Sequence, residues 1–173
     1  MPSIDIRPER AADRKTVFRI NELAFERPDE ARLVEALREQ ARPMVSLVAE
    51  AEGRVAGHIL FTPVEIEDRS RPDQLPAMGL APMAVDPEFQ RQGIGSQLVR
   101  AGLLACREIG QPAVFVLGHP EYYPRLGFRP AAPLGLHYQD HSFDHAFMVA
   151  ELAPGALQGR RGWVRYLPAF EEV

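Results

Sequence analysis

The sequence predicts one α/β domain over residues 1–173, in which strands and amphipathic helices follow one another around a single core. Short runs that alternate apolar and polar residues indicate strands. Apolar residues at helical spacing, first between Ala12 and Ala24 and again between Ile94 and Ala105, indicate helices. A chain of 173 residues is long enough for one core, and no repeat or low-complexity segment divides it.

The N-terminal third is expected to hold one strand and two helices. Residues 3–9 alternate apolar and polar side chains, and the strand should stop at Pro8. A helix is expected from Glu9 to about Phe25. A second helix should follow over residues 30–40, with Asp29 as its N-cap.

The middle of the chain is expected to form three strands. Glu52 and Gly53 separate two apolar runs, which is typical of a hairpin turn. Residues 68–77 are polar and rich in proline, and should form a long loop. The next strand, over residues 78–85, contains Pro82, which cannot donate a backbone hydrogen bond, so we expect a bulge or a sheet edge there.

The C-terminal half should begin with a long helix that ends at Gly110. A buried strand is expected over residues 112–118, and residues 119–128 are too short and proline-rich for a long helix. A later strand should already have begun at His145. Residues after about Pro154 are taken as an extension of the same domain. The expected order is thus β-α-α-β-β-β-α-β-short α-β-β.

Composition excludes several classes of protein. A net charge of −4 and a pI near 5.8 disfavour a general nucleic-acid binder. No apolar run approaches the roughly 20 residues that a membrane span needs, and the N-terminus lacks a signal-peptide pattern. The single cysteine, Cys106, cannot form an intrachain disulfide. We therefore expect a cytoplasmic protein without a membrane partner.

The turn before the long helix is a candidate anion site. A strand leads into the turn and a helix leaves it, so the first backbone N–H groups of the helix have no internal partner. Gly93 and Gly95 lack side chains that would keep a phosphate away. Successive N–H groups from Gln90 to Ser96 could surround the phosphate oxygens, and Arg91 adds positive charge. A plain flexible turn is the alternative.

Other phosphate-binding and acyl-transfer motifs do not fit this turn. A dinucleotide fingerprint needs a third glycine, and that position holds Leu98. No Gly-Lys-Ser/Thr sequence follows, as a P-loop requires. The chain also has no Gly-x-Ser-x-Gly motif, which disfavours a serine hydrolase.

Two sequence blocks resemble the GCN5-related N-acetyltransferase (GNAT) superfamily. Residues 90–95 read QRQGIG and match its acetyl-CoA loop, Gln/Arg-x-x-Gly-x-Gly/Ala, after a strand end that reads MAVDPEF. Residues 116–131 read VLGHPEYYPRLGFRPA and resemble its Tyr-x-x-x-Gly-Phe segment. The runs GHILFTPV and YYPRLGF look most like the bacterial subgroup of acetyltransferases named for YhbS.

This resemblance implies a fold and a cosubstrate. The fold is a mixed, mostly antiparallel sheet of six to seven strands flanked by about four helices, with the fourth and fifth strands splayed apart. The cosubstrate is acetyl-CoA, and no metal is expected. The pyrophosphate would bind the turn, and backbone groups of the fourth strand would pair with the pantetheine arm and hold the thioester oxygen. The predicted cofactor-binding residues are Met83, Ala84, Val85, Gln90, Arg91, Gln92, Gly93, Ile94, Gly95 and Ser96.

The resemblance also implies a general acid and an acceptor pocket. Tyr123 matches the tyrosine that protonates the leaving thiolate, and tyrosine with its reference pKa near 10 is protonated at neutral pH. Tyr122 beside it is a weaker candidate, assigned to the substrate pocket. Phe25 and Glu26, where the first two helices connect, are the expected acceptor contacts.

The general base is less clear, because the fourth strand carries no carboxylate. His119 directly after the fifth strand is the leading candidate. Glu22, Glu26, Glu121 and a chain of waters remain alternatives.

The predicted activity is transfer of acetyl from acetyl-CoA to a primary amine, by direct attack in a ternary complex. The acceptor is a small molecule, peptide or protein that the sequence does not identify, and relatives suggest a homodimer. Two other hypotheses stay open: a non-catalytic acyl-CoA-binding module of the same fold, and a phosphate-binding enzyme of another fold.

Two further features are interpreted as structural. His137, His141 and His145 stand four residues apart, a spacing that would align metal ligands on a helix. Tyr138 and Phe143 interrupt this pattern, so a solvated loop is favoured and no metal is expected. Cys106 falls inside the long helix and is expected in the core.

Overall fold

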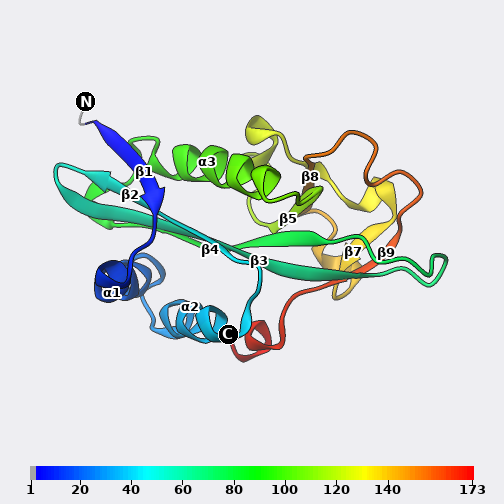
Figure 1. Ribbon diagram of the computed structural model, residues 1–173, viewed down its shortest axis with the longest axis horizontal. Coiled ribbons are helices and arrows are strands. Elements are labelled where there is room, and N and C mark those ends of the chain that lie inside the picture. The colour runs from blue at the N-terminus through cyan, green and yellow to red at the C-terminus, as the bar shows by residue number, and fades with distance from the viewer. Residues whose placement is uncertain (1–2) are drawn as a thin grey trace.

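A mixed sheet runs the length of the molecule and separates its helices into two layers (Figure 1). The structure is a computed structural model and describes residues 3–173. Helix α3 (Ile94–Glu108) covers one face of the sheet, while α1 (Arg14–Phe25) and α2 (Asp29–Gln40) lie on the other. The strands are β1 (Ile4–Pro8), β2 (Val45–Ala51), β3 (Arg54–Glu67), β4 (Ala77–Val85), β5 (Ala113–Leu117), β6 (Arg129–Pro130), β7 (Leu136–Tyr138), β8 (Phe147–Glu151) and β9 (Gly162–Arg165).

The strand order confirms the predicted fold class. The main path is β1-β2-β3-β4-β5-β8-β6, antiparallel except for the parallel pair β4–β5, and β9 joins β3 to β7. Over residues 3–173 the sheet has nine strands rather than six or seven, and three α-helices stand where about four were expected. The added strands β6, β7 and β9 have two to four residues, too few to show a readable alternation.

Helix starts differ from the sequence prediction by a few residues. Asp29 is the first residue of α2 and Pro28 is its N-cap, since the Pro28 carbonyl accepts the N–H of Arg32 at 2.9 Å. The first helix starts at Arg14 rather than at Glu9, after a 3₁₀ turn over residues 11–13. The predicted hairpin turn at residues 52–53 is present.

The later strand also starts after its predicted position. β8 begins at Phe147, whereas the sequence interpretation placed His145 already within the strand. Asp140 caps a 3₁₀ turn over His141–Phe143, and the Nδ1 atom of His145 lies 2.9 Å from the Ser142 carbonyl. These local side-chain bonds hold the chain in a turn and delay the strand by two residues.

The α3 layer lies unusually close to the sheet at one point. A Cβ atom at Gly102 would lie 2.1 Å from Cε2 of Phe61, which is fully buried on β3. Only glycine therefore allows this approach. Burying a phenylalanine side chain contributes about 1.5–3 kcal/mol, so the close approach adds directly to stability.

The C-terminal residues complete the sheet at its far end. β9 pairs with Glu65–Glu67 of β3, and the turn over Pro168–Glu172 packs against α2 (Figure 1). The ring of Tyr166 lies over Gly79 of β4, where a Cβ atom would come within 2.5 Å of Tyr166 Cε2. Across residues 3–173 no helix combines the length and apolar character needed to cross a membrane.

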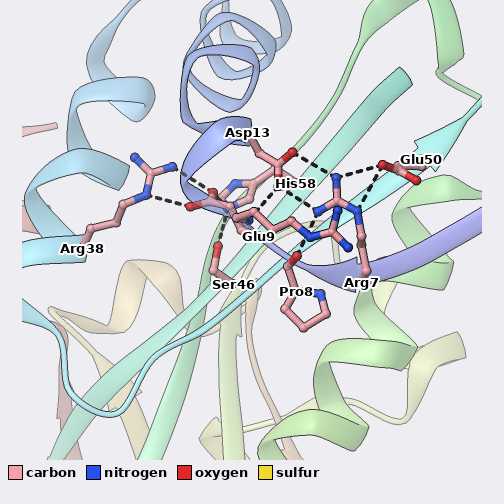
Figure 2. Close-up of polar contacts among 9 residues, drawn as sticks. Arg7, Pro8, Glu9, Asp13, Arg38, Ser46, Glu50 and His58 are labelled. Atoms are coloured by element: carbon pink, nitrogen blue, oxygen red, sulfur yellow. Dashed lines mark hydrogen bonds and ion pairs between the residues drawn. The ribbon is translucent and has the colours of Figure 1, made fainter. Parts of the chain in front are cut away.

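A buried ion-pair network joins Glu9, the residue after β1, to α2 and β3 (Figure 2). The carboxylate of Glu9 accepts two hydrogen bonds of 2.8 Å from the Arg38 guanidinium. The Nε2 atom of His58 lies 3.2 Å from Glu9 and 2.9 Å from the Ser46 hydroxyl. Burial lowers the pKa of His58, which favours the neutral ring. Burial alone would raise the pKa of Glu9, but hydrogen bonds from His58 and Arg38 outweigh it and lower the pKa to about 2.

A second part of this network fixes the start of α1. Arg7 binds the carboxylate of Asp13 with two hydrogen bonds of 2.8 and 2.9 Å and reaches Glu50 on β2 (Figure 2). Asp13 also accepts the backbone N–H of Arg10 at 2.6 Å. The bond from Arg7 is the main reason that the pKa of Asp13 lies below its usual value. These charges are paired within the protein, so the network is structural.

Candidate functional site

The two parallel strands at the centre of the sheet separate after a short contact. β4 and β5 pair only at Met78–Val114 and Gly79–Phe115, although β4 continues to Val85. The opposite edge of β4 pairs with β3 as far as Val85. The edge of β4 that faces β5 therefore has no strand partner beyond Gly79 among residues 3–173, and its backbone groups are available to an extended ligand.

Pro82 lies at a bulge in this part of β4, as predicted. Ile59 of β3 pairs with Met83 and Phe61 pairs with Leu80, so Leu60 faces two residues of β4 instead of one. A bulge bends the strand locally and redirects its backbone groups. It therefore contributes to the separation of β4 from β5.

The turn that follows β4 leads into the N-terminus of α3. Gly93 has φ +83° and is the N-cap of α3, and its carbonyl accepts the N–H of Gln97 at 3.1 Å. The space beside Gly93 is open, since a Cβ atom there would have no atom within 4 Å. A Cβ atom at Gly95 would lie 3.2 Å from the Tyr122 hydroxyl and 3.5 Å from Met83 Cε. The N-terminus of α3 thus lies beside the free edge of β4.

The predicted turn residues divide into two kinds. Ile94 is 1% exposed and belongs to the core, which leaves only its backbone for a ligand. The Gln90 side chain donates to the Val85 carbonyl at 3.0 Å and ties the turn to the end of β4. Arg91 is exposed with φ +64°, and Gln92 is half-buried. Exposure of Arg91 leaves its charge free to meet an anion.

The two adjacent tyrosines have different surroundings. The Tyr122 hydroxyl lies 3.0 Å from the Ser96 hydroxyl, so Tyr122 contacts the glycine turn directly. Tyr123 is 7% exposed and its ring packs edge-on against Tyr122 and Phe128. Burial raises the pKa of Tyr123 to about 12, so its hydroxyl is protonated at neutral pH. The Tyr123 hydroxyl forms no hydrogen bond within the described chain.

Gly118 is a site residue that sequence reasoning missed. It follows β5, and a Cβ atom there would lie 2.4 Å from Cε2 of Tyr123. Any larger residue would displace the tyrosine ring. A glycine directly after an unbroken buried strand was the available signal, because such a position often marks a close approach of two chain segments.

The side chains of the predicted base, His119, and of the acceptor contacts Phe25 and Glu26 form no hydrogen bond with the glycine turn or the two tyrosines in the described chain. His119 is exposed, and among residues 3–173 its ring has no hydrogen-bond partner. Phe25 is 37% exposed at the end of α1, and Glu26 follows with φ +57°. They lie in the connection between α1 and α2, and α1 packs against β3 and β4. Their predicted roles stay predictions.

Cys106 and the three histidines, interpreted from the sequence as structural, lie apart from the glycine turn. Cys106 is fully buried, and burial raises the pKa of its thiol to about 12, which disfavours a nucleophile. His137, His141 and Asp144 gather in one cluster, while His145 bonds elsewhere. A groove of about 1270 Å³ runs along β7, β9 and the end of β3, and none of the predicted acetyl-transfer residues lines it.

The fold and this site define an acetyltransferase class. A central pair of splayed parallel strands, a bulged strand and a glycine turn at a helix N-terminus are the features that the sequence resemblance implied. The family model for the GNAT acetyltransferase domain matches residues 5–131. The chain belongs to this family.

Particular relatives support the predicted subgroup. The chain is 38% identical over 166 residues to the uncharacterized N-acetyltransferase YhbS of Escherichia coli K12, covering 95% of this chain and 97% of that protein. A crystal structure of E. coli YhbS in complex with CoA matches with a TM-score of 0.90 and 36% identity, covering 99% and 93% of the two chains. A GNAT acetyltransferase from Brucella melitensis in complex with acetyl-CoA matches with a TM-score of 0.78 and 33% identity, covering 97% and 98%.

Proposed function

We propose that this protein transfers the acetyl group of acetyl-CoA to a primary amine by direct attack in a ternary complex. The observation that carries the proposal is the divergence of β4 from β5 beside the glycine turn. Family membership and the CoA complexes of two relatives support the choice of cosubstrate.

The chain's own groups fit such a cosubstrate. Backbone N–H groups from Gly93 to Ser96 would hold the pyrophosphate, because the helix N-terminus favours negative charge and no side chain fills the space beside Gly93. The free edge of β4 at Met83 and Val85 would pair with the extended pantetheine arm. A backbone N–H at Met83 or Ala84 would donate to the thioester oxygen, a contribution of about 3–4 kcal/mol in other acyl-transfer sites.

Tyr123 would supply the proton in the chemical step. The amine nitrogen bonds to the acetyl carbon, the carbon–sulfur bond breaks, and the Tyr123 hydroxyl donates its proton to the departing sulfur. Its raised pKa keeps that proton in place until then. The amine proton leaves through His119 or through water, since β4 offers no carboxylate.

Calorimetric titration of acetyl-CoA tests the anchoring part of this proposal. The double variant Gly93→Arg/Gly95→Arg should abolish binding, because two long cationic side chains would fill the turn. Gly110→Arg is the matched control: Gly110 also has a positive φ, +86°, and open space beside it, at the opposite end of α3. Tight binding by wild type and Gly110→Arg, lost in the double variant, supports the proposal. Absence of binding by folded wild type would contradict it.

A non-catalytic acyl-CoA-binding module is the second candidate. The absence of a carboxylate on β4 and the unpartnered ring of His119 favour it. Free-thiol release from acetyl-CoA with a mixed panel of amines separates the two functions. An enzyme releases CoA in proportion to the amine, whereas a binding module releases none above the uncatalysed rate.

A further inference from the structure

A compact group of two imidazoles and one carboxylate lies on β7 and the turn that follows it, beside β9. His137 is on β7, His141 is the first residue of the following turn, and Asp144 comes directly after that turn. One ligand atom from each of the three lies within 4.8 Å of the others. The cluster shares no residue with the glycine turn or with Tyr123.

Asp144 holds both rings at once. Its Oδ1 atom lies 2.8 Å from His137 Nδ1, and its Oδ2 atom lies 3.0 Å from His141 Nδ1. The cluster therefore offers two imidazole nitrogens and one carboxylate oxygen as ligand atoms within a small space.

The surrounding structure fixes the positions of these rings. His137 pairs with Trp163 across the β7–β9 ladder, and the Trp163 ring lies 5.3 Å from both imidazole rings. The two imidazoles stand nearly perpendicular, with centroids 4.7 Å apart. The His141 side chain is 70% exposed and water could satisfy its nitrogens, yet it folds back onto Asp144.

We propose that His137, His141 and Asp144 form a binding site for a divalent transition-metal ion of the Zn²⁺ type. Imidazole nitrogen and carboxylate oxygen are ligands that Zn²⁺ takes at about 2.0–2.2 Å, which places neighbouring ligand atoms roughly 3.4 Å apart in a tetrahedron. On binding, the present Nδ1–oxygen distances of 2.8 and 3.0 Å would lengthen, and the ion would replace the protons that the two Nδ1 atoms now donate to Asp144, releasing them to solvent. Partial exposure of all three side chains lets an ion enter from solvent, with water as the fourth ligand.

The inferred ion has a structural role and takes no part in acetyl transfer. It would link β7 to the turn over His141–Phe143 and add to the hydrogen bonds at Asp144 and the packing of Tyr138 on Phe143 that already join them. The sequence interpretation expected no metal at these histidines because Tyr138 and Phe143 interrupt the helical spacing and a solvated loop was favoured. A strand followed by a tight turn brings the side chains together instead.

Titration of untagged protein with ZnCl₂ tests this inference by calorimetry. We expect saturable 1:1 binding, which His141→Ala and Asp144→Asn each weaken by at least about tenfold, since even outer-shell changes cost that much at metal sites. His145→Ala is the matched control, because this neighbouring histidine bonds to a backbone carbonyl and not to the cluster. Unfolding curves check that each variant is folded.

A second measurement uses the chain's single tryptophan. Trp163 lies beside both imidazoles, so CoCl₂ bound in the cluster should quench its fluorescence in wild type and in His145→Ala but not in His141→Ala. Absence of saturable Zn²⁺ binding by wild type would overturn the inference. So would equal weakening by His145→Ala, which would indicate nonspecific histidine binding.

Discussion

Two regions of the molecule differ in whether their polar groups are paired. One is the buried network formed by Glu9, α2 and β3, and the other is the opening between β4 and β5. In the network, Glu9, Arg38 and His58 are nearly excluded from solvent and bonded to one another. At the opening, the β4 edge beyond Gly79 lacks a strand partner, and the turn at Gly93 leaves open space. Apart from His58 Nδ1, the buried polar side-chain atoms of the network bond within the protein and stabilise one fold, whereas unpaired backbone groups on a rigid frame can bind a ligand.

This contrast predicts that changes in the two regions have separable effects. Variants in the network should lower stability and leave acetyl-CoA binding intact in the folded fraction. Variants at the opening should weaken acetyl-CoA binding or turnover and leave stability near the wild-type value. The following experiments run from the largest expected effect to the smallest.

Arg38→Met should produce the largest loss of stability. It leaves the Glu9 carboxylate buried without its cation, and breaking a buried ion pair in this way typically costs about 3–5 kcal/mol. Urea unfolding followed by circular dichroism measures the change. Arg54→Gln is the control, because Arg54 and Glu88 are exposed and their ion pair should not matter. Equal unfolding midpoints for Arg38→Met and wild type would show that the ion-pair network does not stabilise the fold.

Tyr123→Phe should lower kcat by about 100-fold or more, since it removes a general acid. The unfolding midpoint and the Kd for acetyl-CoA should stay near wild-type values, because the ring and its contacts remain. Thiol release with the best amine from the panel gives kcat, and titration gives Kd. A wild-type kcat in this variant would rule out Tyr123 as the acid.

Acid should weaken the wild-type fold through Glu9. Its folded pKa, about 2, lies below the usual value of 4.5, so its contribution is fully present above pH 4.5 and is lost as pH falls toward 2. One such proton changes stability by at most about 1.4 kcal/mol per pH unit. Urea midpoints at pH 5, 4 and 3 should fall more steeply in wild type than in Glu9→Gln. The pKa values of Asp13 and His58 are also lowered, so the urea midpoint should still fall with pH in both wild type and Glu9→Gln. Equal slopes in the two proteins would contradict the role assigned to Glu9.

Tyr122→Phe should have the smallest effect. It removes one 3.0 Å hydrogen bond to Ser96, worth about 0.5–1.5 kcal/mol. Acetyl-CoA binding should weaken a few-fold, with kcat nearly unchanged, in contrast to Tyr123→Phe. Ser96→Ala and the double variant complete a cycle, and full additivity of the two single changes would mean that the bond has no role in binding.

The sequence by itself determined the fold class, the turn and the family. Gly93 and Gly95 at fixed spacing between a strand and an amphipathic helix indicate local geometry, because backbone freedom and unpaired helix N–H groups depend on neighbours in the chain. Pro82 predicted the bulge because proline has no backbone N–H to donate to a neighbouring strand, which is also a local property. Such local rules can be applied without knowing the rest of the fold.

Only the tertiary structure decided how residues distant in sequence meet. The packing of Tyr123 on Gly118 and the bond from Tyr122 to Ser96 depend on how β5 and α3 are placed against one another. The same holds for the meeting of Glu9, Arg38 and His58, which lie after β1, on α2 and on β3. Burial then lowers the pKa of His58 and raises that of Tyr123, while hydrogen bonds from His58 and Arg38 lower that of Glu9. Both effects are properties of the packed molecule, which no single segment carries.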